Sequence, residues 1–156
     1  MHATDFADRF DRHILPPLRA GYIVVADRYV YTAFVRDAAR GCDPAWVRNA
    51  YSFAPVPDRT FYFQVPVSTS LKRKIASRQK ISYYEAGMDL GLSDDVHASY
   101  ERFQARLKRE YDHLATTDAF VVIDADRPVE TVLSQVRKGV RPLLANFPKT
   151  ATLTHA

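Results

Sequence analysis

Three short apolar runs alternate with longer amphipathic stretches along this chain. The runs cover residues 22–26, 60–65 and 120–123, and they are rich in β-branched and aromatic side chains. Their lengths are typical of strands, and continuous apolar runs without alternation favour a parallel sheet that is covered on both faces. We therefore predict three strands, each ending in polar or turn-forming residues.

The stretches between these runs have helical spacing. Phe6, Phe10 and Ile14 fall four apart, so residues 4–15 are predicted to form a helix. Further helices are expected over residues 29–40, after an Asp43 N-cap, around Leu71 and Ile75, after Asp95, and from Asp126 onward. The helix after Asp95 has the clearest pattern, with apolar residues recurring at spacings of four and three.

This alternation of helices and strands predicts an α/β fold: a three-layer parallel sheet with crossover helices. A chain of 156 residues is of the size of one domain. We expect that domain to cover residues 1–147. Residues 148–156 are small and polar, so we expect a flexible tail there.

The overall composition narrows the classes of protein. The net charge of +4 mildly favours anionic partners such as nucleotides or nucleic acid. Cys42 is the single cysteine, so no internal disulfide can form, and a cytoplasmic location fits. The charged N-terminal residues do not resemble a signal peptide, and the apolar runs are too short to span a membrane. The five histidines show no spacing typical of metal ligands.

Two charged residues, Asp27 and Arg28, follow the first apolar run. Ligands of parallel α/β sheets bind beyond the carboxyl ends of the strands, which is where this pair would lie. An arginine fork suits a phosphate, and a neighbouring carboxylate can hold a metal-bound water or orient the arginine. A surface ion pair, or a cap for the next helix, explains the two residues equally well at this level.

The stretch of residues 59–84 contains six lysines or arginines and no acidic residue. Five of them lie at residues 72–80, which we call the basic segment: Lys72, Arg73, Lys74, Arg78 and Lys80. Taken alone, the pattern is more typical of a solvated basic helix face, or of contacts with a nucleic-acid backbone, than of a catalytic lid.

Four short motifs occur in a characteristic order. They are Phe6-Ala7-Asp8-Arg9; Asp27-Arg28-Tyr29 with Thr32; Pro57-Asp58-Arg59 leading to Leu71-Lys72-Arg73; and Phe103-Gln104-Ala105-Arg106 with Val122-Ile123-Asp124-Ala125. Each is weak by itself. Together they resemble the thymidylate kinases, a family of P-loop nucleoside-monophosphate kinases, over residues 6–144.

The resemblance implies transfer of the ATP γ-phosphoryl group to dTMP, with Mg²⁺ as the metal ion. It implies that Arg28 holds the acceptor phosphate and that Asp27 lies near magnesium, through water. It further implies a basic lid over ATP that contains Arg73 and Arg78, and these two arginines are expected to be catalytic together with Arg28. The implied acceptor site consists of Phe6, Arg9, Asp27, Arg28, Thr32 and Arg36.

The chain departs from the family pattern in one large respect. It contains no Gly-x-x-x-x-Gly-Lys-[Ser/Thr] phosphate loop. In the family a first strand, this loop, a helix and a second strand precede the matching region, and the first strand lies between those at 22–26 and 60–65. We therefore expect a fragment that folds poorly, because two strand edges stay open, and that lacks activity as written.

Smaller departures concern the acceptor. The family often has a stacking Phe at the position of Asp5, Asn or Gln and then Tyr at those of Ala33 and Arg36, and Asp at that of Gln64. These changes leave a nucleotide kinase intact but weaken the case for dTMP. Two alternatives stay open: a kinase for another nucleotide, and a non-catalytic module that binds nucleotides or, less favoured, nucleic acid. Family members are commonly homodimers, so a homodimer is a further possible partner arrangement.

Overall fold

The computed structural model describes residues 2–145 and residue 147. Its helices are α1 (His2–Arg9), the π-helix η1 (Phe10–Ile14), α2 (Leu15–Arg19), α3 (Val30–Ala38), α4 (Pro44–Ala50), α5 (Val67–Ala76), the 3₁₀-helix η2 (Met88–Leu90), α6 (Val96–Thr117) and α7 (Val129–Leu144). Its strands are β1 (Phe61–Gln64) and β2 (Val121–Asp124). The predicted tail at 148–156 lies outside the described residues.

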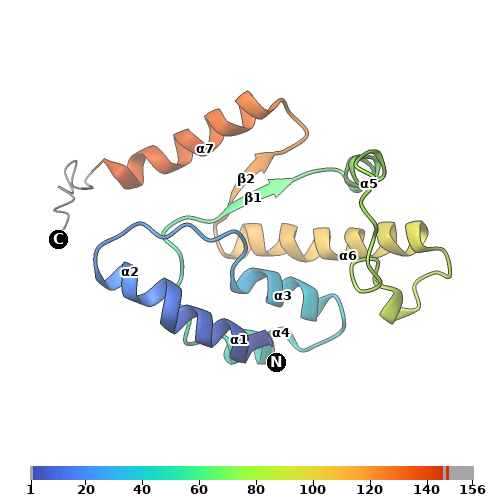
Figure 1. The fold of residues 1–156 in the computed structure, drawn as a ribbon, viewed down its shortest axis with the longest axis horizontal. Helices are drawn as coiled ribbons and strands as arrows, with labels where there is room; N and C mark the ends of the chain where they lie inside the picture. The colour runs from blue at the N-terminus through green and yellow to red at the C-terminus, as the bar shows by residue number, and fades with distance from the viewer. Residues whose placement is uncertain (1, 146, 148–156) are drawn as a thin grey trace.

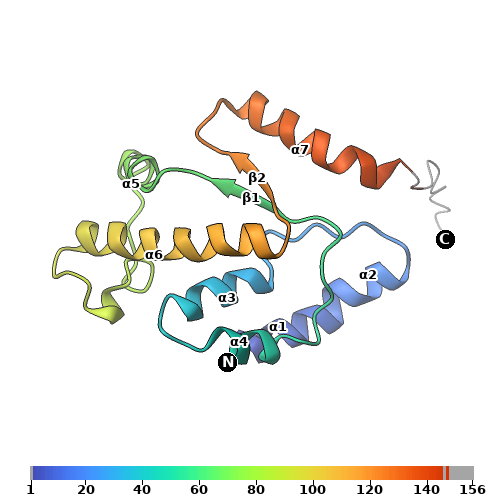
Figure 2. The ribbon, with the colours of Figure 1, turned by 180° about the vertical axis from the view of Figure 1, so that it is seen from behind.

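Strands β1 and β2 pair in parallel, in a register that joins Phe61 to Val121 and Gln64 to Asp124. Successive side chains of a strand point to opposite faces. Phe61 accordingly packs against Gly139 of α7, while Tyr62 stacks on Tyr111 of α6 with ring centroids 5.2 Å apart. Helix α7 therefore lies on one side of the strand pair and α6 with α3 on the other (Figures 1 and 2), as a parallel sheet with crossover helices requires.

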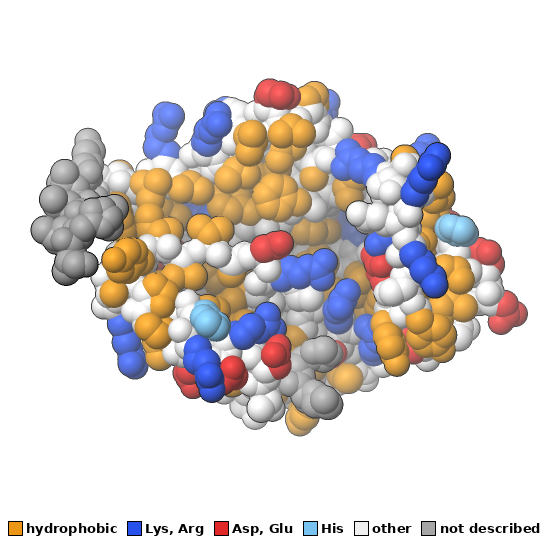
Figure 3. Space-filling model, in the orientation of Figure 1, with side chains coloured by type: hydrophobic (Ala, Val, Ile, Leu, Met, Phe, Trp, Pro, Cys, Tyr) orange, Lys and Arg blue, Asp and Glu red, His pale blue; other side chains and the backbone are white. Residues whose placement is uncertain are grey.

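The prediction of a strand at residues 22–26 is wrong for this structure. The segment runs without regular structure between α2 and α3, and Val25 is 90% exposed. A strand exists only by pairing with a neighbour, and among the described residues β1 pairs with β2 alone. Figure 3 shows hydrophobic side chains gathered on the face of the molecule that Figure 1 presents to the viewer. Ile23, Phe63 and Val122 are exposed, as Val25 is.

The predicted long helix is confirmed as α6, and it carries much of the core. Tyr100, Phe103, Leu107 and Leu114 are buried. The last three of them pack in a cluster with residues of α3 and α4, such as Val35 and Val47. These contacts fix α3, the helix that follows Asp27 and Arg28, against α6.

Two predicted helix caps are also confirmed. The Asp43 carboxylate accepts a hydrogen bond from the backbone N–H of Trp46 at 2.7 Å, and Asp95 accepts one from Ala98 at 2.8 Å. Each bond satisfies a donor that the first turn of a helix leaves unpaired. Helix α7 has the predicted position, but Val129 and Leu133 on it are exposed. Among the described residues, no helix is both long enough and apolar enough to cross a membrane.

Glycines at 87 and 91 bracket η2, both in the left-handed region, with φ of 65° and 59°. They differ in their surroundings. A Cβ on Gly87 would lie 2.6 Å from Cγ of the buried Phe103, whereas a Cβ on Gly91 would meet nothing within 4 Å. The Gly87 backbone is thus in direct contact with the core.

This contrast gives a matched pair of variants. Both Gly87→Ala and Gly91→Ala place a Cβ at positive φ, which costs about 1 kcal/mol. Gly87→Ala also forces Phe103 to move, which adds roughly 1–3 kcal/mol. We expect chemical denaturation to rank Gly87→Ala as the less stable variant by that margin. Equal losses in the two variants would contradict the tight packing at Gly87.

Candidate active site

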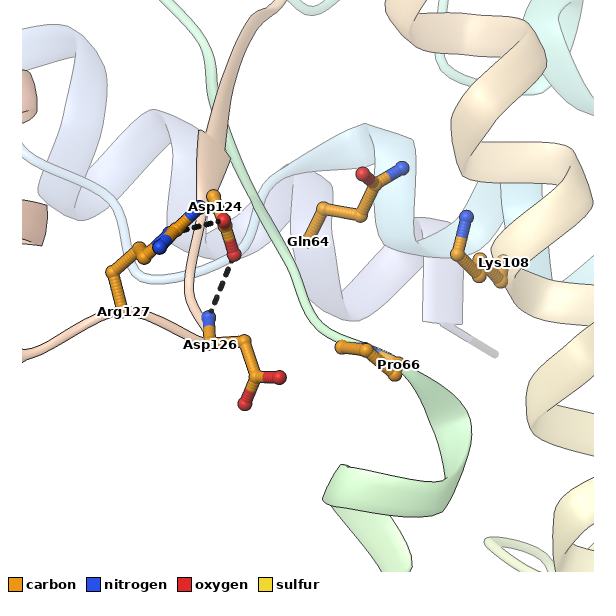
Figure 4. Close-up of a pocket in the computed structure, with 6 residues that line it drawn as sticks. All are labelled: Gln64, Pro66, Lys108, Asp124, Asp126 and Arg127. Carbon is orange, nitrogen blue, oxygen red and sulfur yellow. Dashed lines mark hydrogen bonds and ion pairs between the residues drawn. The ribbon is translucent and has the colours of Figure 1, made fainter.

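The carboxyl ends of β1 and β2 meet at one edge of the sheet, where Gln64 and Asp124 are partners in the register. A cavity of about 500 Å³ opens there (Figure 4). Its lining residues are Gln64, Pro66, Lys108, Asp124, Asp126 and Arg127. Most of these side chains are charged or polar, so the cavity suits a polar ligand.

Asp124 is held in place by the turn that follows β2. Its carboxylate accepts hydrogen bonds from the backbone N–H of Asp126 at 3.0 Å and from Nε of Arg127 at 2.9 Å. The bond from the Asp126 N–H, with that from Arg127, lowers the pKa of Asp124 below its ordinary value. Asp124 therefore presents a fixed negative charge at the cavity.

Arg73 of α5 reaches the same edge. Its guanidinium donates to the Ala125 carbonyl at 3.1 Å and forms an ion pair with Asp126 at 3.2 Å. Both side chains of this pair are about half exposed, so the pair is a weak one. The predicted lid arginine is thus paired with the end of β2, and a phosphate would have to compete with Asp126 for it.

A second set of polar contacts joins β1 to α6 behind the cavity. The Asp112 carboxylate accepts from Nε2 of Gln64 at 2.7 Å, from the Tyr62 hydroxyl at 3.3 Å and from Nζ of Lys108 at 2.6 Å. Burial, together with the neighbouring Asp112, raises the pKa of Tyr62 well above its ordinary value. Tyr62 is therefore a neutral donor, and this network fixes the orientation of Gln64.

The N-terminal candidates have structural partners. The Phe6 ring lies 5.2 Å from that of Tyr29 and packs edge-on against Tyr51, so it belongs to an aromatic cluster. Arg9 forms an exposed ion pair with Asp5 at 2.6 Å. Through Phe6, α1 therefore packs against Tyr29, which directly follows Arg28, the predicted phosphate ligand.

Asp27 and Arg28 are exposed and lie between the apolar segment and α3. Within the described part of the chain, neither side chain makes a hydrogen bond or an ion pair. The backbone of Arg28 is left-handed, with φ of 70°, a conformation that few non-glycine residues adopt. Such strained positions cluster at functional sites.

The other candidates divide between α3 and α5. The Thr32 hydroxyl lies 3.5 Å from that of Tyr111, and Arg36 is exposed one turn further along α3. Arg78 follows α5, is exposed and has a φ of 53°. The acceptor candidates therefore lie on α1, on α3 and in the segment just before α3, whereas the lid candidates lie on α5 or just after it.

Sequence reasoning missed several residues at the sheet edge: Lys108, Asp112, Asp126 and Arg127. The i,i+4 spacing of Lys108 and Asp112 on α6 was a usable signal for that pair. Nothing local could have shown that Asp112 also binds Gln64, which is 48 residues away.

The predicted magnesium ligand can be judged by its chemistry. Within the described residues, no group of three or more histidines, cysteines or carboxylates is arranged to hold a metal ion. Mg²⁺ commonly uses one or two carboxylates together with substrate phosphates and waters. The exposed carboxylate of Asp27 fits that limited role.

Comparison with known proteins identifies the family. The family model described as thymidylate kinase matches residues 1–136. The chain is 41% identical over 139 residues to the probable thymidylate kinase 2 of Saccharolobus solfataricus, and 32% and 30% identical to the probable thymidylate kinases of Thermococcus kodakarensis and Staphylothermus marinus. These alignments cover 88%, 92% and 89% of the chain.

These matches place the chain in the class of P-loop α/β proteins. The parallel pairing of β1 with β2 is consistent with part of such a fold. The chain belongs to the thymidylate kinase family. It spans 65%, 64% and 63% of the lengths of the three relatives.

The polar network at Asp112 predicts a clear difference between two substitutions. Asp112→Ala leaves the half-buried Gln64 amide and Tyr62 hydroxyl without their acceptor, which costs about 1–3 kcal/mol. Lys108→Ala removes only an i,i+4 ion pair worth about 0.3–0.5 kcal/mol. Urea denaturation of the two variants measures this difference, and a Lys108→Ala loss as large as that of Asp112→Ala would argue against the network.

Proposed function

We propose that this chain supplies the acceptor site and the basic lid of a thymidylate kinase, which transfers the γ-phosphoryl group of ATP to dTMP. The family match supports the reaction class, and the relatives named thymidylate kinase support dTMP as the acceptor. Such transfer depends on in-line positioning and on positive charge around the moving phosphoryl group. The exposed arginines of this chain can provide that charge.

One observation supports the acceptor site most directly: the conformation and exposure of Arg28. Its guanidinium is free of any hydrogen bond or ion pair within the described residues, so it is available to a phosphate. In the proposed site Arg28 holds the acceptor phosphate, and Asp27 approaches Mg²⁺ through water. Phe6, Arg9, Thr32 and Arg36 contact the rest of the acceptor nucleotide.

The lid is proposed to be the basic segment, residues 72–80. Arg78 is exposed, and Arg73 is held only by a weak ion pair with Asp126 that an incoming nucleotide can replace. Mg²⁺, bound with ATP, supplies charge neutralisation on the phosphates. The chain's own contribution is to bring Arg73 and Arg78 over them.

The ATP phosphates also need a phosphate loop, and the 156 residues contain no stretch of that pattern. The relatives are longer than the part that this chain matches. We propose that catalysis requires a phosphate loop supplied from outside these residues and that the 156-residue chain alone is inactive. Homodimer formation and a cytoplasmic location stay predictions.

A second candidate function is a non-catalytic module that binds nucleotides or nucleic acid through the basic segment. Two exposed tyrosines, Tyr83 and Tyr84, lie just after this segment, and aromatic rings beside basic residues can stack on bases. Salt-sensitive binding to oligonucleotides without phosphoryl transfer by the intact protein would favour this function.

The test begins with the intact protein from its source cells. Its mass shows whether the cell makes a chain longer than 17.8 kDa. Formation of ADP and dTDP from ATP and dTMP is then measured on that protein. Transfer that depends on both nucleotides and on Mg²⁺ supports the proposal, and its absence refutes it.

The role of Arg28 predicts that activity and stability separate in one variant. Arg28→Gly removes the guanidinium but suits the left-handed backbone, so the free energy of unfolding should change by less than about 1 kcal/mol. Loss of a charge-assisted phosphate contact worth about 1.5–3 kcal/mol should lower kcat/KM for the acceptor roughly 10- to 100-fold. Arg109→Ala, which alters an exposed arginine of α6, is the control; wild-type kinetics in Arg28→Gly would exclude the role.

The substrate preference follows from the residues that differ from the family pattern. Asp5, Ala33 and Arg36 occupy positions where the family often has residues that contact thymine or the sugar. We therefore expect the intact protein to phosphorylate dTMP and dUMP at similar rates, measured side by side under the same conditions. A large preference for dTMP would show that other residues recognise the thymine methyl group.

A further inference from the structure

Arg40, two residues beyond the end of α3, makes more polar contacts than the other arginines of the described chain. Its guanidinium donates to both carboxylate oxygens of Asp89, at 2.9 and 3.3 Å, and to the Tyr84 carbonyl at 3.1 Å. The same group lies over the Phe103 ring, 4.7 Å from its centroid. The Arg40 and Asp89 side chains are only 24% and 23% exposed, and the bond from Arg40 lowers the pKa of Asp89.

Two partners of Arg40, Asp89 and Tyr84, belong to one segment, residues 82–91, which we call the anchor loop. Arg40 also donates to the Arg36 carbonyl of α3 at 3.4 Å. This loop is also fixed to α6. The buried Ser99 hydroxyl donates to the Ala86 carbonyl at 2.8 Å, and Nε2 of Gln104 donates to the Glu85 carbonyl at 3.2 Å. With Gly87 in contact with Phe103, the loop is held between α3 and α6.

The anchor loop in turn holds the basic segment. The Glu85 carboxylate pairs with Lys74 of α5, and both side chains are largely sheltered from solvent. A continuous series of contacts therefore runs from Arg40 through Asp89 and the anchor loop to Glu85 and Lys74. It joins the helix that carries Thr32 and Arg36 to the helix that carries Arg73.

A purely stabilising role for Arg40 has a direct comparison in this chain. Arg48 of α4 makes a similar pair, with both oxygens of Asp118 at 2.8 and 3.2 Å, and lies 5.0 Å from the Phe34 ring centroid. That pair joins α4 to the turn before β2 and does not reach the basic segment. Arg40 and Arg48 thus share their chemistry but differ in what they connect.

We propose that Arg40 is a positioning residue: through Asp89 and the anchor loop it sets the position of the basic segment relative to α3. This inference rests on the proposed function, because that position matters for transfer between a nucleotide held near α3 and one under the basic segment. Misplacement of a catalytic group by about 1 Å can lower a rate roughly 100-fold. Arg40 itself contacts no reacting atom.

The test compares Arg40→Lys with Arg48→Lys in the intact protein. Each change keeps the positive charge but removes the planar fork that binds both carboxylate oxygens. Distance distributions are measured by pulsed EPR between spin labels on Cys42, which is exposed, and on a cysteine introduced at Lys72. Melting temperature, kcat and the two KM values are measured on the unlabelled variants.

We expect Arg40→Lys to broaden the distance distribution and to lower kcat about 10- to 100-fold, with less than a threefold change in KM for the acceptor. Arg48→Lys should lower the melting temperature similarly while leaving the distances and kcat unchanged. An unchanged distribution in Arg40→Lys would overturn the inference, and so would a broadened one with wild-type kcat. If the wild-type protein transfers no phosphoryl group, the proposed function fails, and the distance measurement alone decides the inference.

Discussion

Most of this structure depends on the parallel pairing of β1 with β2. Because side chains alternate along a strand, that one ladder sends Phe61 toward α7 and Tyr62 toward α6, and so places a helical layer on each side. The same register brings Gln64 beside Asp124, at the edge where the polar cavity opens. The layers and the candidate site are therefore consequences of a single set of backbone hydrogen bonds.

The elements that the sequence predicted correctly are those whose signals are local. An aspartate before a proline or an apolar repeat identifies the starts of α4 and α6, and the apolar runs identify β1 and β2. The segment at 22–26 has an equally apolar sequence, yet it is not a strand. Its sequence is suited to a strand, but a strand also needs a neighbour to pair with, and in the described structure this segment is not paired with β1 or β2.

For the candidate site as well, the sequence was enough to nominate individual residues but not to show how they pair. The order of the motifs was enough to nominate Arg28, Arg73 and Arg78, because the resemblance to the family can be recognised from the sequence alone. It could not show that Arg73 is paired with Asp126, or that Arg40 and Asp89, separated by 49 residues, bind one another. Such pairings depend on how α3, α5 and α6 pack, and no local pattern encodes the geometry between helices. The resemblance to the family identifies the charged side chains, and the structure shows which of them already have a partner of opposite charge.

Backbone conformation separates the three arginines further. Among the described residues, the non-glycine residues with positive φ are Arg28, Arg78 and Ala119. Ala119 lies in the turn that ends α6, and Arg78 follows the last turn of α5, where its N–H binds the Ile75 carbonyl. A left-handed residue is common at such helix ends. Arg28 instead precedes a helix, and stability alone would favour glycine or asparagine there. Its conformation has no explanation in capping, and a strained residue at this position is what the proposed phosphate-binding role of Arg28 would explain.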